Sequence, residues 1–342
     1  MIEEFNKYLM ELVDDKVFPG CSYAIIVENK VMTGYIGYET YDKEKKIDEN
    51  SLYDIASLTK LLVTNTLISL LIEEEKIELD DLVKKYLPKF KYDNIKIVHL
   101  LTHSSGLKVK YTKDTLKSIN DFYNLDLEFE AGTTTAYRDI NFILLGFIVE
   151  KVYKNKIDKV AKELIFDKLN MHNTMYNPKE KDRCVPTENN TRLIKGEVQD
   201  WKASFLKGLA GHAGIFSNVS DLATFLEVIL NDGIYNKNYF ISSNLIDLWF
   251  TPLFIDNNDI RRTIGWIYAK STPVCKDLVS NDAIFHTGYP GNHIIIDRGN
   301  DLSFVLLSNA TYPTGSKESI VNKRIEINKN LYQLLKKYDY IY

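Results

Sequence analysis

The feature that most constrains this fold is a long apolar run at residues 61–72, directly after the tetrad Ser57-Leu58-Thr59-Lys60. Its length and apolarity predict a buried helix. Residues three positions apart on a helix share a face and lie about 5–6 Å apart, so we expect Ser57 and Lys60 to be neighbours at the helix start. An amine that burial or a nearby cation keeps neutral can take the proton of a serine hydroxyl, and the helix N-terminus favours the resulting negative charge. A lone tetrad of this kind is more often a solvated helix start capped by the serine, so a catalytic interpretation requires partners elsewhere.

Tyr137 is the first candidate partner. It lies in segment 131–139, whose glycine and run of threonines predict a loop, and an apolar helix follows at 141–150. A tyrosine at such a junction can project its hydroxyl into a cleft. There, as a phenolate or with its pKa lowered beside Lys60, it can serve as general base or as the acid for a leaving group. The alternative is half-buried packing, which is the commoner role of a lone tyrosine.

The second candidate is the segment His286-Thr287-Gly288-Tyr289-Pro290-Gly291, which ends a predicted strand. Glycine lets a substrate backbone approach a strand closely. The backbone N–H of Tyr289 would then join that of Ser57 as an oxyanion hole, the pair of donors that acyl transfer needs. Taken alone, the segment is more simply a hairpin turn with a partly exposed histidine.

The order of elements predicts an α+β fold. Strand patterns occur near both chain ends, whereas the middle of the chain is helical, with Ser220 as the expected cap of one helix. We therefore expect an antiparallel sheet built from both chain ends, flanked by terminal helices, with an inserted all-helical lobe. The chain would be a single domain, 1–342, with a sheet lobe at about 1–56 plus 260–342, a helical lobe at about 57–259, and a site in the cleft between them. The expected strands are 21–27, 31–38, 263–268, 283–288, 293–297 and 302–308, and the expected helices include 1–13, 141–150, 220–230 and 316–337.

Composition excludes several classes of partner. The chain has 342 residues, is 45% hydrophobic, and carries a net charge of −4, so it lacks the basic field that holds nucleic acid or an anionic membrane. The first 13 residues are acidic and amphipathic, unlike a signal peptide, and no apolar stretch approaches the length of a membrane span. The three cysteines are far apart and suggest neither a disulfide framework nor a metal site. We expect a cytoplasmic protein with no membrane span.

The three segments together resemble the serine β-lactamase and penicillin-binding protein superfamily, in the branch of class C β-lactamases, D-alanyl-D-alanine carboxypeptidases and related esterases. The order is the same: Ser-x-x-Lys early, a Tyr-x-Asn-type element mid-chain, and a Lys/His-Thr-Gly element late. The resemblance covers about residues 15–310 and extends to the flanks. These flanks are residues 18–20, 53–60, 99–107, 129–133, 208–217 and 221–223.

The resemblance implies a role for each matching residue. Ser57 would be acylated and Lys60 would keep it activated, while Tyr137 would shuttle protons to the leaving group and from the deacylating water. The strand His286-Thr287-Gly288 would orient the substrate, and the backbone N–H groups of Ser57 and Tyr289 would hold the oxyanion. The substrate would be a small-molecule ester, β-lactam or D-amino-acid peptide, with no cofactor.

Two departures from the family pattern narrow this prediction. Asp139 stands where the family often has asparagine. A carboxylate there only accepts hydrogen bonds, and its charge would tend to keep Lys60 protonated. His286 stands where β-lactamases typically have lysine and would be mostly neutral near pH 7, so it would bind a substrate carboxylate less firmly. Both departures argue against an efficient β-lactamase.

Two further histidine positions leave alternatives open. His212, among small residues in Gly211-His212-Ala213-Gly214, either lines the cleft or is a loop histidine satisfied by backbone groups. His99 and His103 are spaced as zinc ligands on a predicted helix, but no third ligand is evident, so we expect no metal.

The sequence therefore predicts a serine hydrolase that cleaves an ester or a D-amino-acid amide through an acyl-enzyme. The alternatives are a D,D-carboxypeptidase or weak β-lactamase, and a non-catalytic penicillin-binding or sensing module. Intact Ser57, Lys60 and Tyr137 argue against the last of these. The sequence contains no signal for an oligomeric state.

Overall fold

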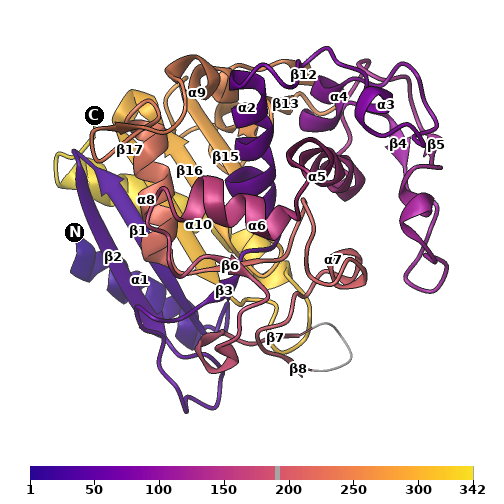
Figure 1. The fold of residues 1–342 in the computed structure, drawn as a ribbon. Coiled ribbons are helices and arrows are strands. Elements are labelled where there is room, and N and C mark those ends of the chain that lie inside the picture. Colours follow the sequence, from indigo (N-terminus) through magenta and orange to yellow (C-terminus); the bar gives the residue numbers. More distant parts are fainter. Residues whose placement is uncertain (189–192, 342) are drawn as a thin grey trace.

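An eight-stranded antiparallel sheet forms the framework of the molecule in the computed structural model, which describes residues 1–188 and 193–341 (Figure 1). Its strand order is β12-β13-β14-β15-β16-β17-β1-β2, so strands from the two chain ends pair at β1 and β17, with Cys21 opposite Ser308. This confirms the predicted sheet. The strands are β1 Gly20–Val27, β2 Lys30–Gly37, β12 Phe254–Ile255, β13 Arg261–Arg262, β14 Ile267–Tyr268, β15 Ala283–Thr287, β16 His293–Asp297 and β17 Leu302–Ser308.

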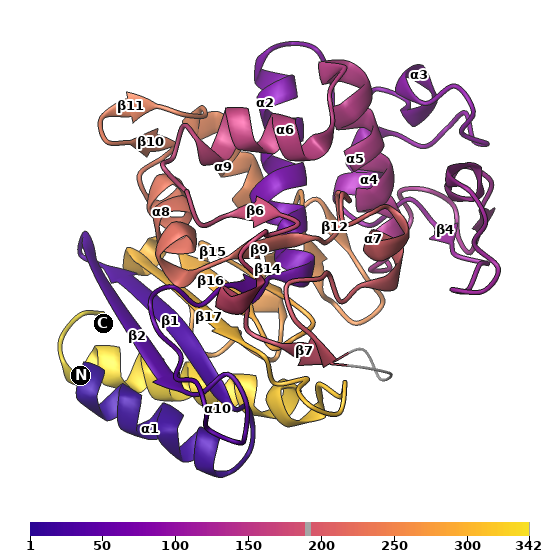
Figure 2. The same cartoon turned by 60° about the horizontal axis from the view of Figure 1, so that its bottom comes forward.

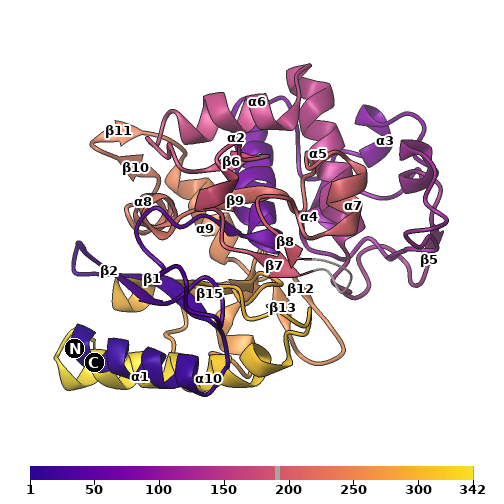
Figure 3. The ribbon, with the colours of Figure 1, turned by 90° about the horizontal axis from the view of Figure 1, so that it is seen from below.

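The two terminal helices, α1 (Ile2–Asp14) and α10 (Glu318–Lys337), lie side by side on one face of this sheet (Figures 2 and 3). Strand β1 is buried along its whole length because both faces of the sheet are covered. Successive side chains of a strand point to opposite faces, so Tyr23 and Ile25 pack toward the terminal helices while Ala24 and Ile26 pack in the other core. The sheet thus separates two apolar cores.

The apolar run after Ser57 forms the central helix of the second core, as predicted. It begins as a 3₁₀ turn at Ala56–Leu58, continues as a π-helical segment at Lys60–Asn65, and ends as α2 (Thr66–Glu73). The stretch Ala56–Glu73 is long and apolar enough to cross a membrane, but 83% of it is buried inside the protein, as expected of a core helix. Its burial places Ser57 and Lys60 at the junction of the sheet and the helical region.

The inserted region is helical in its main elements, as predicted, and also contains short strands. Among the described residues, the strands of the large sheet lie within 20–37 and 254–308. The lobe boundaries at about 57 and 260 stay a prediction. The other helices are α3 Val83–Tyr86, α4 Ile97–Leu101, α5 Asp139–Tyr153, α6 Ile157–Ala161, α7 Trp201–Phe205, α8 Val219–Leu230 and α9 Ser243–Phe250. The short strands are β3 Tyr53–Asp54, β4 Leu107–Lys108, β5 Asp126–Leu127, β6 Met175–Tyr176, β7 Thr187–Glu188, β8 Leu193–Ile194, β9 Ile215–Ser217, β10 Ile234–Tyr235 and β11 Asn238–Tyr239.

Two local predictions were wrong. Helix α8 is capped by Asn218, whose side chain accepts a hydrogen bond from the Asp221 backbone N–H at 3.0 Å, and Ser220 lies inside the helix. Of the predicted strand 263–268 only the last two residues form a strand, β14; residues 263–266 are a turn between β13 and β14, because Gly265 adopts a φ of +81° and Thr263 N–H bonds Trp266 O at 3.1 Å. Arg262, directly before this turn, lines the cavity.

Candidate active site

Ser57 lies in the 3₁₀ turn that opens the central helix, one turn before Lys60. The Lys60 Nζ donates a hydrogen bond to Ser57 Oγ at 3.0 Å, which confirms that the two residues are neighbours. The preceding residue, Ala56, has a φ of +47°, a strained conformation for a residue with a Cβ. Asp54 holds this turn, since its carboxylate accepts from the backbone N–H of Ala56 at 2.8 Å and of Gln199 at 2.9 Å.

Tyr137 reaches Ser57 from the opposite side. Its hydroxyl donates to Ser57 Oγ at 2.9 Å, from the loop that ends where α5 begins. The tyrosine ring packs against the buried His103, with ring centroids 4.6 Å apart, and Lys60 Nζ lies 4.9 Å from its centroid. A hydroxyl and an amine therefore converge on one serine oxygen, as the sequence predicted.

Lys60 is a protonated ammonium in this arrangement. It is fully buried and donates three hydrogen bonds: to Ser57 Oγ, to Asp139 Oδ1 at 2.9 Å and to the backbone oxygen of His212 at 3.2 Å. Burial lowers the pKa of Lys60, but the negative charge of Asp139 and the neighbouring Tyr137 outweigh it, and the net shift is upward. Lys60 is therefore not the neutral amine that could take the proton of Ser57. The prediction that the charge of Asp139 would keep Lys60 protonated agrees with this arrangement.

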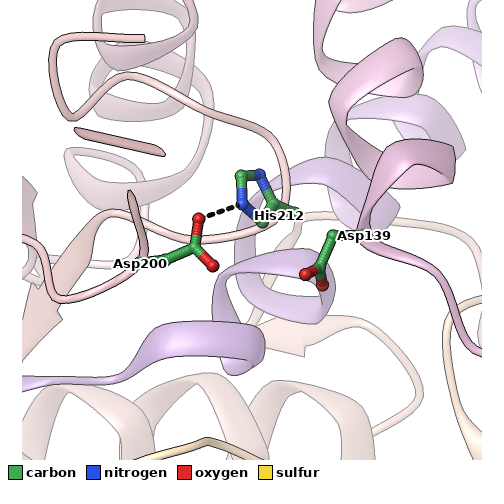
Figure 4. A group of neighbouring side chains, drawn as sticks. All are labelled: Asp139, Asp200 and His212. Carbon is green, nitrogen blue, oxygen red and sulfur yellow. Dashed lines mark hydrogen bonds and ion pairs between the residues drawn. The ribbon is translucent and has the colours of Figure 1, made fainter. Parts of the chain in front are cut away.

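A chain of alternating charges continues from Asp139. Lys202 Nζ lies 3.0 Å from Asp139 Oδ2 and 3.1 Å from Asp200 Oδ2, and His212 Nε2 lies 2.8 Å from Asp200 Oδ1. Figure 4 shows both carboxylates beside the imidazole. Burial raises the pKa of the Asp139 carboxyl, but Lys60, His212 and Lys202 together lower it more, so Asp139 is ionised.

Of the two roles considered for His212, the structure shows that it lines the cleft, and its imidazole bonds a carboxylate instead of backbone groups. Its side chain lines the cavity and pairs with Asp200, while its backbone oxygen accepts from Lys60. Sequence reasoning missed Asp200 and Lys202. The available signal was an aspartate directly before a short helix, since Asp200 caps α7 by accepting from the backbone N–H groups of Lys202 and Ala203, both at 2.9 Å.

This group has the spacing of a metal site. Asp139, Asp200 and His212 each offer one ligand atom, and these atoms lie within 4.8 Å of one another. Both carboxylates, however, already accept from lysine ammonium groups, because Lys202 bridges them and Lys60 binds Asp139. We therefore assign this group to the charge network and place no metal there.

His286 is the second-last residue of strand β15 and is neutral. It is 2% exposed, so the alternative of a partly exposed turn histidine is wrong. Burial, together with the charges of Lys60 and Arg262, lowers the pKa of His286 to about 3. Its Nδ1 lies 2.9 Å from both the backbone N–H and the backbone oxygen of Thr287, so these contacts fit either tautomer of the neutral ring. Nε2 has no hydrogen-bond partner among the described residues, so it is free to meet a ligand.

The residues after His286 form the neighbouring wall. Thr287, Gly288 and Tyr289 line the same cavity as Ser57. A Cβ at Gly288 would lie 2.7 Å from the backbone oxygen of Ile55, so glycine permits this strand to approach the segment that carries the nucleophile. The oxyanion role of the Tyr289 backbone N–H stays a prediction.

Arg262, on β13, is a site residue that sequence reasoning missed. Its side chain is buried, and its guanidinium carbon lies 5.6 Å from the centre of the Tyr137 ring. Burial lowers the pKa of the Arg262 guanidinium. Its Nε and Nη1 have no hydrogen-bond acceptor among the described residues. No motif signalled this arginine, because the turn at Gly265 that positions it interrupts a segment that looks like one continuous strand.

These side chains line a cavity of about 1010 Å³. Its charged lining is more positive than negative, although the chain as a whole carries a net charge of −4. A cleft of this sign concentrates anionic ligands. The lining cations are Lys113, Lys181, Lys207, Arg262, Lys317 and Arg324, and the lining anions are Asp139, Glu197 and Asp200.

Comparisons with known proteins bear on the family and the fold of the chain. A family model described as Beta-lactamase matches residues 5–326. The "N-acetylmuramyl-L-alanine amidase" of Bacillus subtilis (strain 168) is 27% identical over 85% of this chain and 77% of its own length. The "Putative D-alanyl-D-alanine carboxypeptidase" of Escherichia coli (strain K12) is 28% identical over 90% of this chain and 82% of its own.

A solved class C β-lactamase has the same fold, with a TM-score of 0.80 and 20% sequence identity. The match covers 96% of this chain and 96% of that one. At this identity the likeness concerns the fold alone, and it confirms the fold that the sequence predicted.

Proposed function

Because the chain belongs to the β-lactamase family, we propose that it is a serine hydrolase that works through an acyl-enzyme on a carboxylate-bearing amide or ester. The single observation that carries this proposal is the convergence of Lys60 Nζ, at 3.0 Å, and Tyr137 Oη, at 2.9 Å, on the oxygen of Ser57. A binding or sensing module would not need an amine and a phenol around the oxygen of one serine hydroxyl.

Acylation forms a bond between Ser57 Oγ and the substrate carbonyl carbon, and the bond from that carbon to the leaving group breaks. Tyr137 relays the proton, since its oxygen takes the serine proton as its own hydroxyl proton goes to the leaving group. Lys60 and Arg262 lie 4.9 Å and 5.6 Å from the tyrosine ring, and their positive charge stabilises the negative charge on the phenolic oxygen. In this mechanism Lys60 remains an ammonium that positions Ser57.

Deacylation repeats these transfers with water. Tyr137 takes a proton from the water that attacks the acyl carbon, and it returns that proton to Ser57 as the ester bond breaks. In both steps the oxyanion would be held by the backbone N–H groups of Ser57 and Tyr289. Thr287 and Gly288 would align the substrate along the end of β15.

Arg262 supports a substrate with a carboxylate near the scissile bond. A planar guanidinium binds a carboxylate through two parallel hydrogen bonds, and a buried cation whose N–H groups lack acceptors is best satisfied by such an anion. His286 is neutral and supplies no such charge. The names of the two relatives make a cell-wall peptide amide the first substrate to test.

Ester hydrolysis is the second candidate. The neutral His286 and the carboxylate of Asp139 depart from the pattern expected of an efficient β-lactamase, while the acylating groups around Ser57 serve an ester equally well. A weak β-lactamase activity would follow from the same chemistry.

One panel of substrates tests these alternatives. We would measure turnover of p-nitrophenyl acetate, mono-p-nitrophenyl succinate, nitrocefin, a D-Ala-D-Ala peptide and a muramyl-L-alanine amide, with Ser57→Ala as control. We expect turnover that depends on Ser57 and is faster for the anionic succinate than for the neutral acetate. Turnover that survives Ser57→Ala contradicts the proposal, and fast penicillin labelling without any turnover favours a sensing module.

We also propose a cytoplasmic location. It is supported by Cys21, Cys184 and Cys275, which are free and buried, as suits a reducing compartment. Fractionation of cells that express the full chain tests it, and recovery outside the cytoplasmic fraction contradicts it.

A further inference from the structure

Two acidic side chains lie unusually close together beside the nucleophile. Asp139 and Asp200 both line the cavity, and one oxygen of each lies within 4.8 Å of the other and of a His212 nitrogen (Figure 4). Like charges at this distance, in a partly desolvated wall, disfavour ionisation of both groups. Yet burial raises the pKa of each carboxyl less than its basic partners lower it, so both are ionised. Something must therefore balance the second negative charge.

Lys202 supplies that balance. Its ammonium lies 3.0 Å from Asp139 and 3.1 Å from Asp200, and its side chain is only 14% exposed. The backbone of Lys202 is bound to the same network, since its N–H donates to Asp200 Oδ1 at 2.9 Å. The backbone N–H of Lys202 is thus held by the cap at the start of helix α7, and its ammonium is held by the ion pairs with the two carboxylates.

The network divides the two oxygens of Asp139 between two cations. Oδ1 accepts from Lys60 and Oδ2 faces Lys202. The position of Lys60 therefore depends on Lys202. Without Lys202, Asp139 Oδ2 would be unpaired and the carboxylate would attract the Lys60 ammonium more strongly. That attraction would compete with the hydrogen bond from Lys60 to Ser57 Oγ.

We propose that Lys202 is a positioning residue for the Ser57 centre: by bridging Asp139 and Asp200 it leaves Lys60 free to hold the nucleophile and keeps the cleft open to anionic substrates. This rests on the hydrolase activity proposed above. Lys202 acts through Asp139 and Lys60 and does not touch the reacting atoms.

The test compares Lys202→Met with Lys329→Met, which removes an exposed lysine of α10 that neither lines the cavity nor contacts either aspartate. Substrates are neutral p-nitrophenyl acetate and anionic mono-p-nitrophenyl succinate. For Lys202→Met we expect kcat to fall about tenfold with both esters and KM to rise about fivefold more for the succinate, because the two carboxylates beside Ser57 then lose one of their positive partners. For Lys329→Met we expect changes of no more than about twofold.

Rescue separates positioning from a purely structural role. The double variant Lys202→Met/Asp139→Asn removes both members of a pair, so it should recover most of the kcat lost in Lys202→Met, and Lys202→Arg should retain it. The double variant and Lys202→Arg also keep the test valid if Lys202→Met fails to fold. The proposal is overturned if Lys202→Met matches Lys329→Met with both esters, or if the double variant is no better than Lys202→Met.

These outcomes are distinct from failure of the proposed function. If the wild-type protein hydrolyses neither ester in a Ser57-dependent way, the hydrolase proposal fails. If it does so and Lys202→Met behaves as wild type, only the role of Lys202 fails.

Discussion

The two faces of the large sheet bury different kinds of side chain, although the same strands supply both. Toward α1 and α10 the packing is largely apolar, with Phe5 edge-on to Tyr23 and Phe304 at centroid distances of 5.0 and 6.0 Å. The face toward the central helix leads to a cleft wall with a buried lysine, a buried neutral histidine and a buried arginine whose Nε and Nη1 lack acceptors among the described residues. The first face is built for stability and the second for chemistry.

Magnitudes explain why one molecule needs both faces. Burying one large apolar side chain contributes about 1.5–3 kcal/mol to folding. Burying an ion costs several kcal/mol unless it is paired. Arg262 therefore destabilises the free protein, and the terminal-helix face, with its extended apolar core, offsets that cost. The comparison predicts that changes on one face alter mainly activity and that changes on the other alter mainly stability.

The largest expected effect is that of Tyr137→Phe. Loss of the hydroxyl removes the proton shuttle, so kcat/KM for p-nitrophenyl esters should fall by about 10²–10⁴-fold. The melting temperature should stay within a few degrees of wild type, because the ring and its packing against His103 remain. An unchanged rate in steady-state kinetics would remove Tyr137 from the mechanism.

Leu331→Ala should do the reverse. Leu331 is fully buried where α10 packs on the sheet, so its truncation should lower the free energy of unfolding by about 2–5 kcal/mol. At a temperature where the variant is folded, kcat and KM should match wild type, because Leu331 does not line the cavity. Urea unfolding and ester kinetics on the same sample check both halves, and a large loss of kcat in the folded variant would contradict the division between faces.

Arg262→Met should separate substrate binding from folding. For mono-p-nitrophenyl succinate we expect KM to rise about 10–100-fold, while the neutral acetate changes little, because only the anion uses the guanidinium. The variant should be at least as stable as wild type, since it removes a buried charge without acceptors and keeps an apolar side chain of similar length. Equal effects on the two esters, measured by steady-state kinetics, would contradict carboxylate binding at this position.

The last prediction concerns the pH dependence of stability, and it compares two buried histidines on opposite faces of the sheet. Burial lowers the pKa of His286, on the cleft side, and of His293, which contacts Asn328 of α10, to about 3. Between about pH 6.5, the unfolded value, and pH 3, the unfolded chain binds a proton that the folded chain excludes. The contribution of each histidine to the free energy of unfolding is therefore intact above pH 6.5. It declines as the pH falls, by at most about 1.4 kcal/mol per pH unit.

Urea unfolding across this pH range checks that sign. His286→Gln and His293→Gln should each flatten the decline in unfolding free energy by a similar amount. Only His286→Gln should change the kinetic constants, because only His286 lines the cleft. Equal kinetic effects of the two variants would mean that the faces are not independent.

Much of the fold could be predicted because its signals are local. Alternating strand patterns placed β1, β15, β16 and β17, and the apolar run placed the central helix. The failures were also local in origin. Gly265 turned a predicted strand into a hairpin through its positive φ, and Asn218 started α8 two residues before the expected cap at Ser220.

The sequence by itself determined that Ser57 and Lys60 are neighbours, because an i, i+3 pair on a helix is close whatever surrounds it. The order of the motifs and their flanking segments resembles a known family, and this resemblance assigned Tyr137 and His286 to the same site. Only the tertiary structure decided the charge of Lys60, which depends on Asp139, 79 residues away, and on the backbone of His212, 152 residues away. The same holds for Arg262 and for the Lys202–Asp200 bridge, since electrostatic balance in a buried site depends on the distances and burial of groups that the chain brings together only when folded.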